Sequence, residues 1–153
     1  LTKNETDASR KAYGNGLGSL YKKTVAAKFT VDDITTLKKF NESKDPSVLE
    51  TLSTKKIILE SVINDLLGMS VPYSAASYHL LVINSISQYK SLVENMVAVR
   101  EDPIRAALSF NAYESTLRTL STSFVMMQNY FLVENITFTN NEPGFAIQTK
   151  YTK

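Results

Sequence analysis

The feature that most constrains the fold is a pair of long, mostly apolar seams at helical spacing. The first seam advances in steps of four and three residues, and its members are Ala75, His79, Val82, Ile86, Tyr89, Val93 and Met96. The second seam keeps the same steps, and its members are Phe110, Tyr113, Leu117, Leu120, Phe124, Met127 and Phe131. This spacing is typical of helices that pack side by side with interlocking side chains. Residues 73–133 therefore predict two long helices in contact.

An aspartate followed by a proline separates the two seams. Asp102 can accept hydrogen bonds from free amide groups at a helix start, and Pro103 suits the first helical position because it has no amide hydrogen. The sequence predicts one helix over about 73–101 and another from Pro103 onward. Because the connection is short, the two helices should form an antiparallel hairpin.

Two further helices precede this hairpin. Apolar residues at helical spacing predict one over 8–28 and one over 46–67. Asp45 followed by Pro46 repeats the start signal, and Gly68 is placed to end the second helix with a left-handed cap. Together with the hairpin, they predict an all-α fold, an antiparallel four-helix bundle.

A short extra helix should connect the first bundle helix to the next. Thr30 and Asp33 have the spacing of a capping box, in which the two side chains satisfy free amide groups at the start of a helix over 31–42. We expect this segment to be a connector and not a member of the bundle.

The periodicity changes towards the C-terminus. Ile136 and Phe138 alternate with threonine, Phe145 and Ile147 alternate with small or polar residues, and a turn at 140–144 separates the two runs. A small β-hairpin and an extended, docked tail fit this pattern equally well. A chain of 153 residues fits one domain. We expect a helical bundle at 1–133 and a C-terminal tail at 134–153 docked on the same domain.

Three glycines, Gly14, Gly16 and Gly18, interrupt the first predicted helix. Each costs up to about 1 kcal/mol relative to alanine. Gly14 and Gly18 lie one turn apart, so we interpret them as a place where another helix packs closely. The spacing does not match a dinucleotide-binding loop, and no buried strand precedes it. No cofactor is predicted.

The single histidine, His79, belongs to the first seam, where a hydrogen-bonded core residue is the simplest interpretation. A ferritin-like iron site would need a glutamate three residues earlier, and that position is Ala76. The chain has no cysteine, so it has no thiolate ligand and no thiol nucleophile. The sequence predicts no metal site.

Acidic residues occur in pairs, but at positions that have an ordinary explanation. Asp32 with Asp33 and Glu101 with Asp102 lie at predicted helix starts, where negative charge is favourable. No acidic pair is set in an apolar context, and neither a nucleophile elbow nor a phosphate-binding loop is present. We therefore expect a protein that is not an enzyme.

Charge and hydropathy limit the partners and the location. The net charge of +2 is too small to indicate nucleic acid, and no apolar run has the roughly 18 to 20 residues of a transmembrane helix. The lack of cysteine suits an exported bacterial protein. Because the sequence begins at Leu1, we expect a removed signal peptide and an extracytoplasmic location: periplasm, cell surface or secreted.

Residues 73–133 contain few charges for two helices of this length. Only eight of these 61 positions are Asp, Glu, Lys or Arg, and most other polar positions are Ser, Thr, Asn or Gln. Depletion of charge is a property of interface cores. Either the two helices are central in the fold or they present a weakly charged face to a partner.

Several short segments resemble an uncharacterised family of exported helical proteins from small-genome, uncultured bacteria. The resembling segments are Tyr13-Gly14-Asn15, Val71-Pro72, His79-Leu80, Asn95-Met96, Glu101-Asp102-Pro103, Asn135-Ile136-Thr137-Phe138 and Glu142-Pro143-Gly144. The resemblance implies a location in the cell envelope or outside the cell, and it implies no activity.

Two functional hypotheses follow. The first is a non-enzymatic envelope or surface protein that acts through contacts with a protein partner or with itself, as a subunit or accessory of a secretion or surface assembly. The second is a bundle that holds a small hydrophobic ligand in its core, lined by His79, Tyr89 and Phe124. Core packing explains the same aromatic residues.

Overall fold

The computed structural model describes residues 5–26 and 32–148, and over these residues it is all helical, without a strand. The predicted all-α class is confirmed. The helices are α1 (Asp7–Ala26), α2 (Asp33–Ser43), α3 (Glu50–Leu67), α4 (Ala76–Val97), α5 (Pro103–Val133) and α6 (Phe145–Gln148). Short 3₁₀ helices occur at Pro46–Leu49, Tyr73–Ala75 and Ala98–Arg100.

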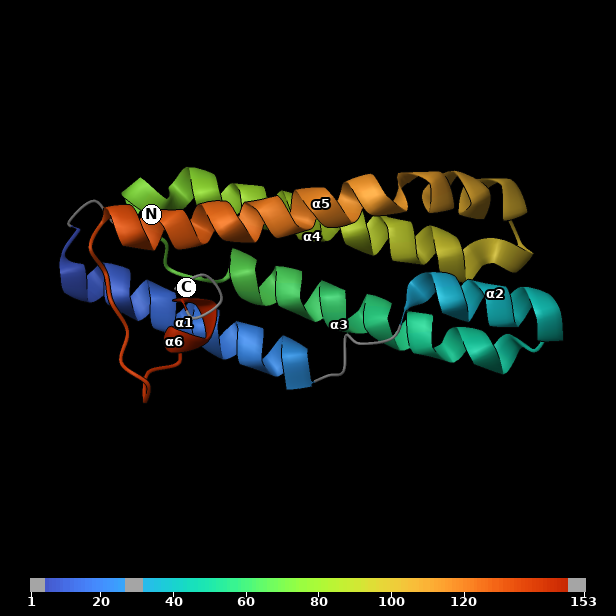
Figure 1. Ribbon diagram of the computed structural model, residues 1–153, viewed down its shortest axis with the longest axis horizontal. Helices are drawn as coiled ribbons and strands as arrows, with labels where there is room; N and C mark the ends of the chain where they lie inside the picture. Colours follow the sequence, from blue (N-terminus) through green and yellow to red (C-terminus); the bar gives the residue numbers. More distant parts are fainter. Residues whose placement is uncertain (1–4, 27–31, 149–153) are drawn as a thin grey trace.

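The long helices pack in chain order, and α4 lies between its two neighbours. α4 and α5 form the antiparallel hairpin that the short connection predicts, and α3 packs against α4 (Figure 1). α1 and α2 both pack against α3, with α1 along one half of the molecule and α2 along the other (Figure 1).

α2 is more than the expected connector. It buries Asp33, Thr36 and Phe40 against the other helices. The helix begins at Asp33, and its cap is Asp32, whose carboxylate accepts a hydrogen bond from the Ile34 amide at 3.0 Å. The predicted cap, Thr30, lies outside the described residues.

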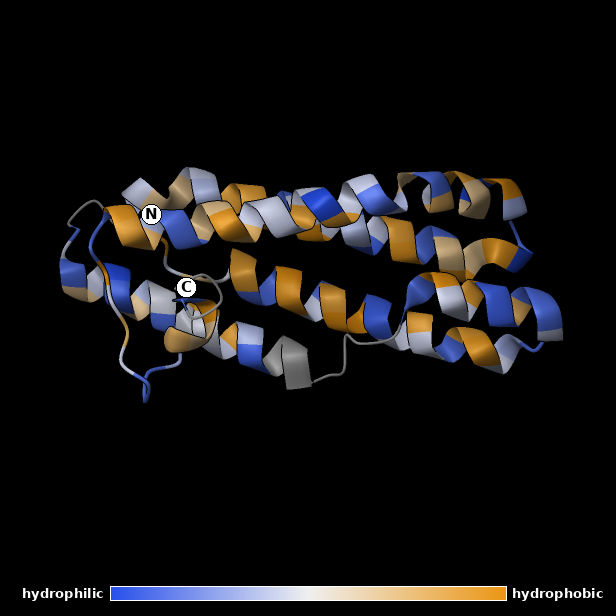
Figure 2. Ribbon diagram, viewed as in Figure 1, coloured by the Kyte–Doolittle hydropathy of each residue, from blue (hydrophilic) through white to orange (hydrophobic). Residues whose placement is uncertain are grey.

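The helix predicted over 46–67 has Asp45 as its cap and ends at Leu67, as expected, but its first turn is 3₁₀ and its C-terminal cap has another conformation. Asp45 accepts a hydrogen bond from the Ser47 amide at 2.9 Å, and the chain passes through a 3₁₀ turn before α3 proper. Along α3, hydrophobic and hydrophilic residues alternate, as one buried face requires (Figure 2). Gly68 follows the last residue of the helix in a right-handed conformation, with φ −80°, and its amide still donates to the carbonyl oxygen of Asn64. The prediction of a left-handed cap at Gly68 was therefore wrong.

The two predicted seams have different outcomes. All seven residues of the first seam are buried, six of them on α4 and Ala75 in the 3₁₀ helix before it. On α5 the seam is buried at Met127 and Phe131, but Phe110 is 45% exposed. The reason is that small residues of α5 also approach α4, since Ser123 is fully buried and its hydroxyl lies 2.8 Å from that of Ser85.

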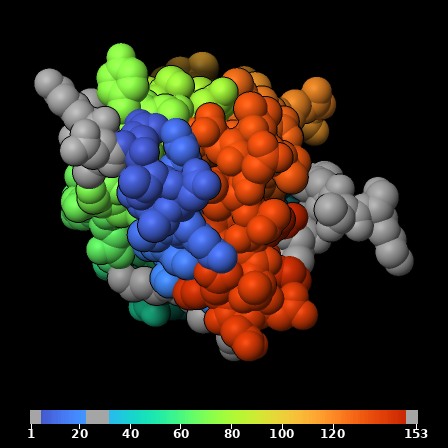
Figure 3. Space-filling view, turned by 90° about the vertical axis from the view of Figure 1, so that its left-hand side faces the viewer, coloured from blue at the N-terminus to red at the C-terminus, as the bar shows by residue number. Residues whose placement is uncertain are grey.

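The chain after α5 packs along α1. It turns at Asn135, which has a left-handed φ of 56°, and buries Ile136, Phe138 and Ile147. Figure 3 shows this segment beside α1 at one end of the molecule. Residues 145–148, expected as part of a second strand or extended tail, form α6, so the hairpin is absent from the described residues.

Gly14 and Gly18 lie under this C-terminal segment. A Cβ added at Gly14 would lie 2.2 Å from the ring of Phe138, and one at Gly18 would lie 2.1 Å from the carbonyl oxygen of Pro143. The glycines therefore permit close approach, as their spacing indicates. For Gly18 the approaching element is the C-terminal segment and not another long helix, which corrects that interpretation.

Candidate functional site

A buried polar cluster joins four helices at the α2 end of the molecule. Asp33 of α2 is fully buried and forms an ion pair with Lys55 of α3. The hydroxyl of Tyr89 on α4 donates to Asp33 at 2.6 Å, and that of Tyr113 on α5 donates at 3.3 Å. Lys55 also lies 3.3 Å from the Tyr89 hydroxyl. We name these four residues the Asp33 cluster.

The Asp33 cluster corrects the interpretation of Asp33 as an ordinary helix-start charge. Asp32 caps the helix, while Asp33 points into the protein and meets a cation. One signal was available in the sequence: Lys55 occupies a core position of α3, in the series Leu52, Lys55, Leu59, Val62 and Leu66, which advances by three and four residues. A lysine at such a position needs a buried anion.

The arrangement of the Asp33 cluster fits a structural role, in which its hydrogen bonds and ion pair hold four helices together. Burial raises the pKa of Tyr89, with the hydrogen bond to Asp33 adding to the effect. Burial likewise raises the pKa of Tyr113, with the nearby negative charge of Asp33 as the second cause. Both hydroxyls therefore stay protonated and donate to the carboxylate. The cluster fixes how α2, α3, α4 and α5 meet.

His79 is a buried core residue whose two ring nitrogens both have partners. Its Nε2 lies 3.1 Å from the carbonyl oxygen of Leu66, which can only accept, so Nε2 carries the hydrogen. Nδ1 then accepts a hydrogen bond from the Tyr13 hydroxyl at 2.9 Å. Burial lowers the pKa of His79 and so favours the neutral ring. His79 joins α1, α3 and α4.

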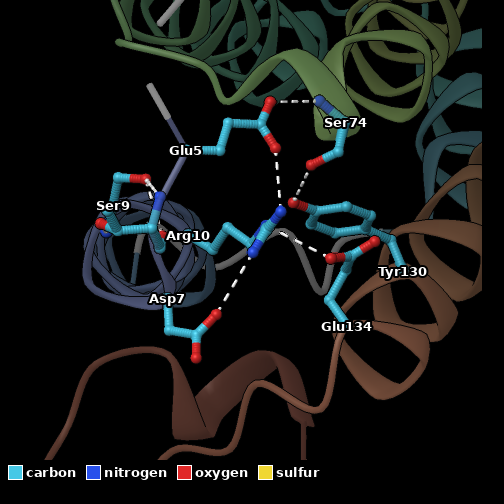
Figure 4. A network of polar contacts seen from close by, with 8 residues as sticks. Glu5, Asp7, Ser9, Arg10, Ser74, Tyr130 and Glu134 are labelled. Atoms are coloured by element: carbon cyan, nitrogen blue, oxygen red, sulfur yellow. Dashed lines mark hydrogen bonds and ion pairs between the residues drawn. The ribbon is translucent and has the colours of Figure 1, made fainter. Parts of the chain in front are cut away.

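A second polar network closes the opposite end of the molecule. The Arg10 guanidinium lies 3.1 Å from Glu5, 3.2 Å from Asp7 and 3.3 Å from Glu134 (Figure 4). Glu5 also accepts a hydrogen bond from the Ser74 amide at 2.7 Å, and this contact with Ser74 is the main cause that lowers the pKa of Glu5. The network joins the start of α1 to the 3₁₀ helix before α4, through Ser74, and to the end of α5, through Glu134.

An apolar cavity lies between five helices, where α1 comes to its end. Its volume is about 350 Å³. Tyr89 and Phe124, which the sequence proposes as ligand-lining residues, both contribute to its wall. His79, the third residue of that proposal, is buried against Tyr13 and Leu66 and is not part of the wall.

One face of α5 points away from the protein and is uncharged along its whole length. Nine exposed residues share this face, and we name them the outward stripe: Ile104, Leu108, Asn111, Ser115, Thr119, Thr122, Met126, Asn129 and Val133. They advance by three or four residues, which keeps them on one side of the helix. Ile104 is 74% exposed and Val133 is 76% exposed.

Neither a metal-binding group nor a helix that could span a membrane is found among the described residues. Among them, no group of three or more His, Asp or Glu side chains is placed to hold a metal ion. No helix within the described ranges combines the length and the apolar character needed to cross a membrane.

Comparison with known proteins gives no relative from which a role could be transferred. No family model, no curated protein and no solved structure matches this chain. The resemblance to exported proteins of uncultured bacteria therefore stays a prediction.

Proposed function

We propose that this protein is a non-enzymatic assembly protein of the cell envelope or cell surface, and that the outward stripe of α5 is its contact surface. The observation that carries the proposal is the exposure of an uncharged, partly apolar face that spans the longest helix. Of the 31 residues of α5, 18 are exposed, and only Arg105, Glu114 and Arg118 among them are charged. Large side chains exposed in this way favour contact with a partner.

The partner that charge complementarity favours is a second copy of this chain. Glu114 and Arg118 lie at one edge of the outward stripe, 3.5 Å apart and both largely exposed. Suppose that two α5 helices pack antiparallel through their outward stripes, with the two-fold axis at the level of Thr116 along the helix. Glu114 of one copy then faces Arg118 of the other. Parallel pairing would place Glu114 and Arg118 of the two copies at opposite edges of the contact, where neither charge meets an opposite charge of the partner.

The apolar residues of the outward stripe fit the same antiparallel pairing. Ile104 and Leu108 at one end of the helix then lie opposite Met126 of the other copy. Small side chains such as Ser115 occupy the middle, where the two helices come closest. The buried surface would therefore be apolar towards both ends and closely packed at the centre.

The expected strength follows from the size of this contact. α5 is about 46 Å long at 1.5 Å per residue and about 10 Å wide. A contact along its length covers on the order of 500 Å² per copy, in the range of weak, reversible interfaces. We expect a dimer that dissociates on dilution.

The proposal includes the finer architecture and the location. α1 and α2, which both pack on α3, would share the fourth position of an antiparallel four-helix bundle, with α5 at its edge. A chain without cysteine suits an oxidising compartment outside the cytoplasm. Fractionation of the native cells, followed by an antibody against the protein, tests the location; recovery in the cytoplasm alone would refute it.

A cysteine scan tests the contact, because the chain contains no cysteine of its own. Ser115 lies next to the proposed two-fold axis, so Ser115→Cys should give a disulfide-linked dimer under mild oxidation. Ser61→Cys, on the exposed face of α3, is the matched control and should stay monomeric. If the two variants cross-link to the same extent, the outward stripe is not the contact surface.

A further inference from the structure

The apolar cavity is separate from the outward stripe and has features of its own. Five helices contribute to its wall, through residues such as Leu17, Leu59, Ile86, Phe124 and Ile147. Its volume of about 350 Å³ exceeds the roughly 150 Å³ of an apolar protein cavity that binds benzene. By that comparison, the cavity has room for roughly a dozen non-hydrogen atoms.

The wall determines what kind of molecule fits. Among the described residues that line the cavity, none carries a charge. Tyr89 is part of the wall, but its hydroxyl already donates to Asp33 at 2.6 Å. A charged ligand would lose its hydration without meeting an opposite charge, whereas a neutral apolar molecule would lose little. The wall therefore favours a neutral ligand.

Two polar side chains mark one side of the cavity. Ser121 and Gln128 of α5 line it together with Phe124 and Val125, at the spacing of a single helix face. Ser121 is exposed and Gln128 is half-buried, so these two groups lie where the cavity meets solvent. They can exchange hydrogen bonds with a hydroxyl or carbonyl group while the hydrocarbon part lies inside.

We infer that the cavity binds a neutral, apolar molecule that carries one hydroxyl or carbonyl group, such as an aliphatic alcohol. Hydrophobic burial supplies the affinity, and Ser121 with Gln128 orients the polar end. None of the α5 residues at the cavity belongs to the outward stripe, so a dimer and a ligand can be present at the same time.

The test compares three probes that share one chain length and differ in charge: 1-decanol, decanoate and decylammonium. Isothermal titration of the full chain at pH 7 should show 1-decanol binding at least tenfold more tightly than either ion. Equal or tighter binding of decanoate or decylammonium would overturn the inference, because the uncharged wall would then have no influence on selection.

Two variants locate the binding. Val125→Trp and Ala146→Phe each add a bulky group to the wall from a different helix, and each should lower the affinity for 1-decanol at least tenfold. Thr54→Trp, on the exposed face of α3, is the matched control and should bind like the original chain. The second filling variant decides the result if the first does not fold. Unchanged affinity in a folded filling variant, or a crystal structure with the cavity filled by the chain's own atoms, would overturn the inference.

Discussion

α4 and α5 are similar as sequences and opposite as structures. Both are long and poor in charge, and their seams have the same spacing. α4 lies between α3 and α5 and buries nine of its 22 residues, whereas α5 buries six of 31 and leaves 18 exposed. Low charge therefore has two different causes in neighbouring helices. In α4 it follows from burial, and in α5 burial does not explain it.

This difference shows which of the two helices is poor in charge without being buried. Sequence alone leaves open whether residues 73–133 are central in the fold or face a partner. The structure gives the first answer for α4. For α5 burial gives no such answer, because the residues of the outward stripe are exposed, and we therefore propose the second.

The largest contrast is expected from the same charge placed on each helix. Val93 of α4 is fully buried, so Val93→Asp should cost at least about 4 kcal/mol in the free energy of unfolding. Thr119→Asp, on the outward stripe, should change it by less than about 0.5 kcal/mol. Urea denaturation measures both. Similar losses in the two variants would break the comparison.

The next effect concerns the polar groups packed against α4. Asp33→Ala removes the carboxylate that forms a buried ion pair with Lys55, which should cost about 3 to 5 kcal/mol in the free energy of unfolding. Replacing both partners, Asp33→Leu with Lys55→Met, removes both buried charges and should recover most of that loss. Thermal unfolding of the single and double variants distinguishes the two cases, and equal losses would show that the ion pair is unimportant.

A substitution at Gly18 tests whether close packing against α1 holds the C-terminal segment over the end of α5. The C-terminal segment lies over Phe131 of α5, with the rings of Phe131 and Phe138 5.4 Å apart. Because a Cβ at Gly18 would meet the backbone of Pro143, Gly18→Ala should displace this segment at a cost of about 1 to 3 kcal/mol. Ser19→Ala, on the exposed side of the same turn, is the control. Hydrogen exchange over 134–148 should rise only in the first variant.

The smallest effect is a pH dependence on the buried face of α4. Burial lowers the pKa of His79. Below about pH 6.5, His79 is therefore protonated in the unfolded chain and still neutral in the folded chain. His79 should therefore make the protein less stable as the pH falls, by up to about 1.4 kcal/mol per pH unit. His79→Gln removes this contribution. Parallel plots of stability against pH for the two proteins would contradict the assignment.

Local patterns predicted the parts of this fold that depend on local physics. The starts of α3 and α5 follow from aspartate and proline, and the buried face of α4 follows from its spacing. The Asp33 cluster did not follow, because its members are up to 80 residues apart and no local rule says which helices meet. Lys55 at a core position was the one usable sign.

Long-range packing also explains the errors in α5 and at the C-terminus. Ser85 and Ser123 look like surface residues, yet they are buried because α4 and α5 approach closely there. α6 forms where alternation suggested a strand, since Ile147 finds its apolar neighbours in the cavity wall and not across a sheet. Of the three residues proposed to line a ligand or the core, Tyr89 and Phe124 contribute to the cavity wall, whereas the buried ring of His79 is held outside it by Tyr13 and Leu66.

Sedimentation equilibrium across a range of protein concentrations tests the central claim most directly. We expect the mass to rise from the 17.1 kDa of one chain towards twice that value, and we expect Leu108→Asp to stay at one chain while unfolding at nearly the same temperature. A chain that remains a monomer at every concentration, or a Leu108→Asp variant that associates as strongly as the original, would contradict the account.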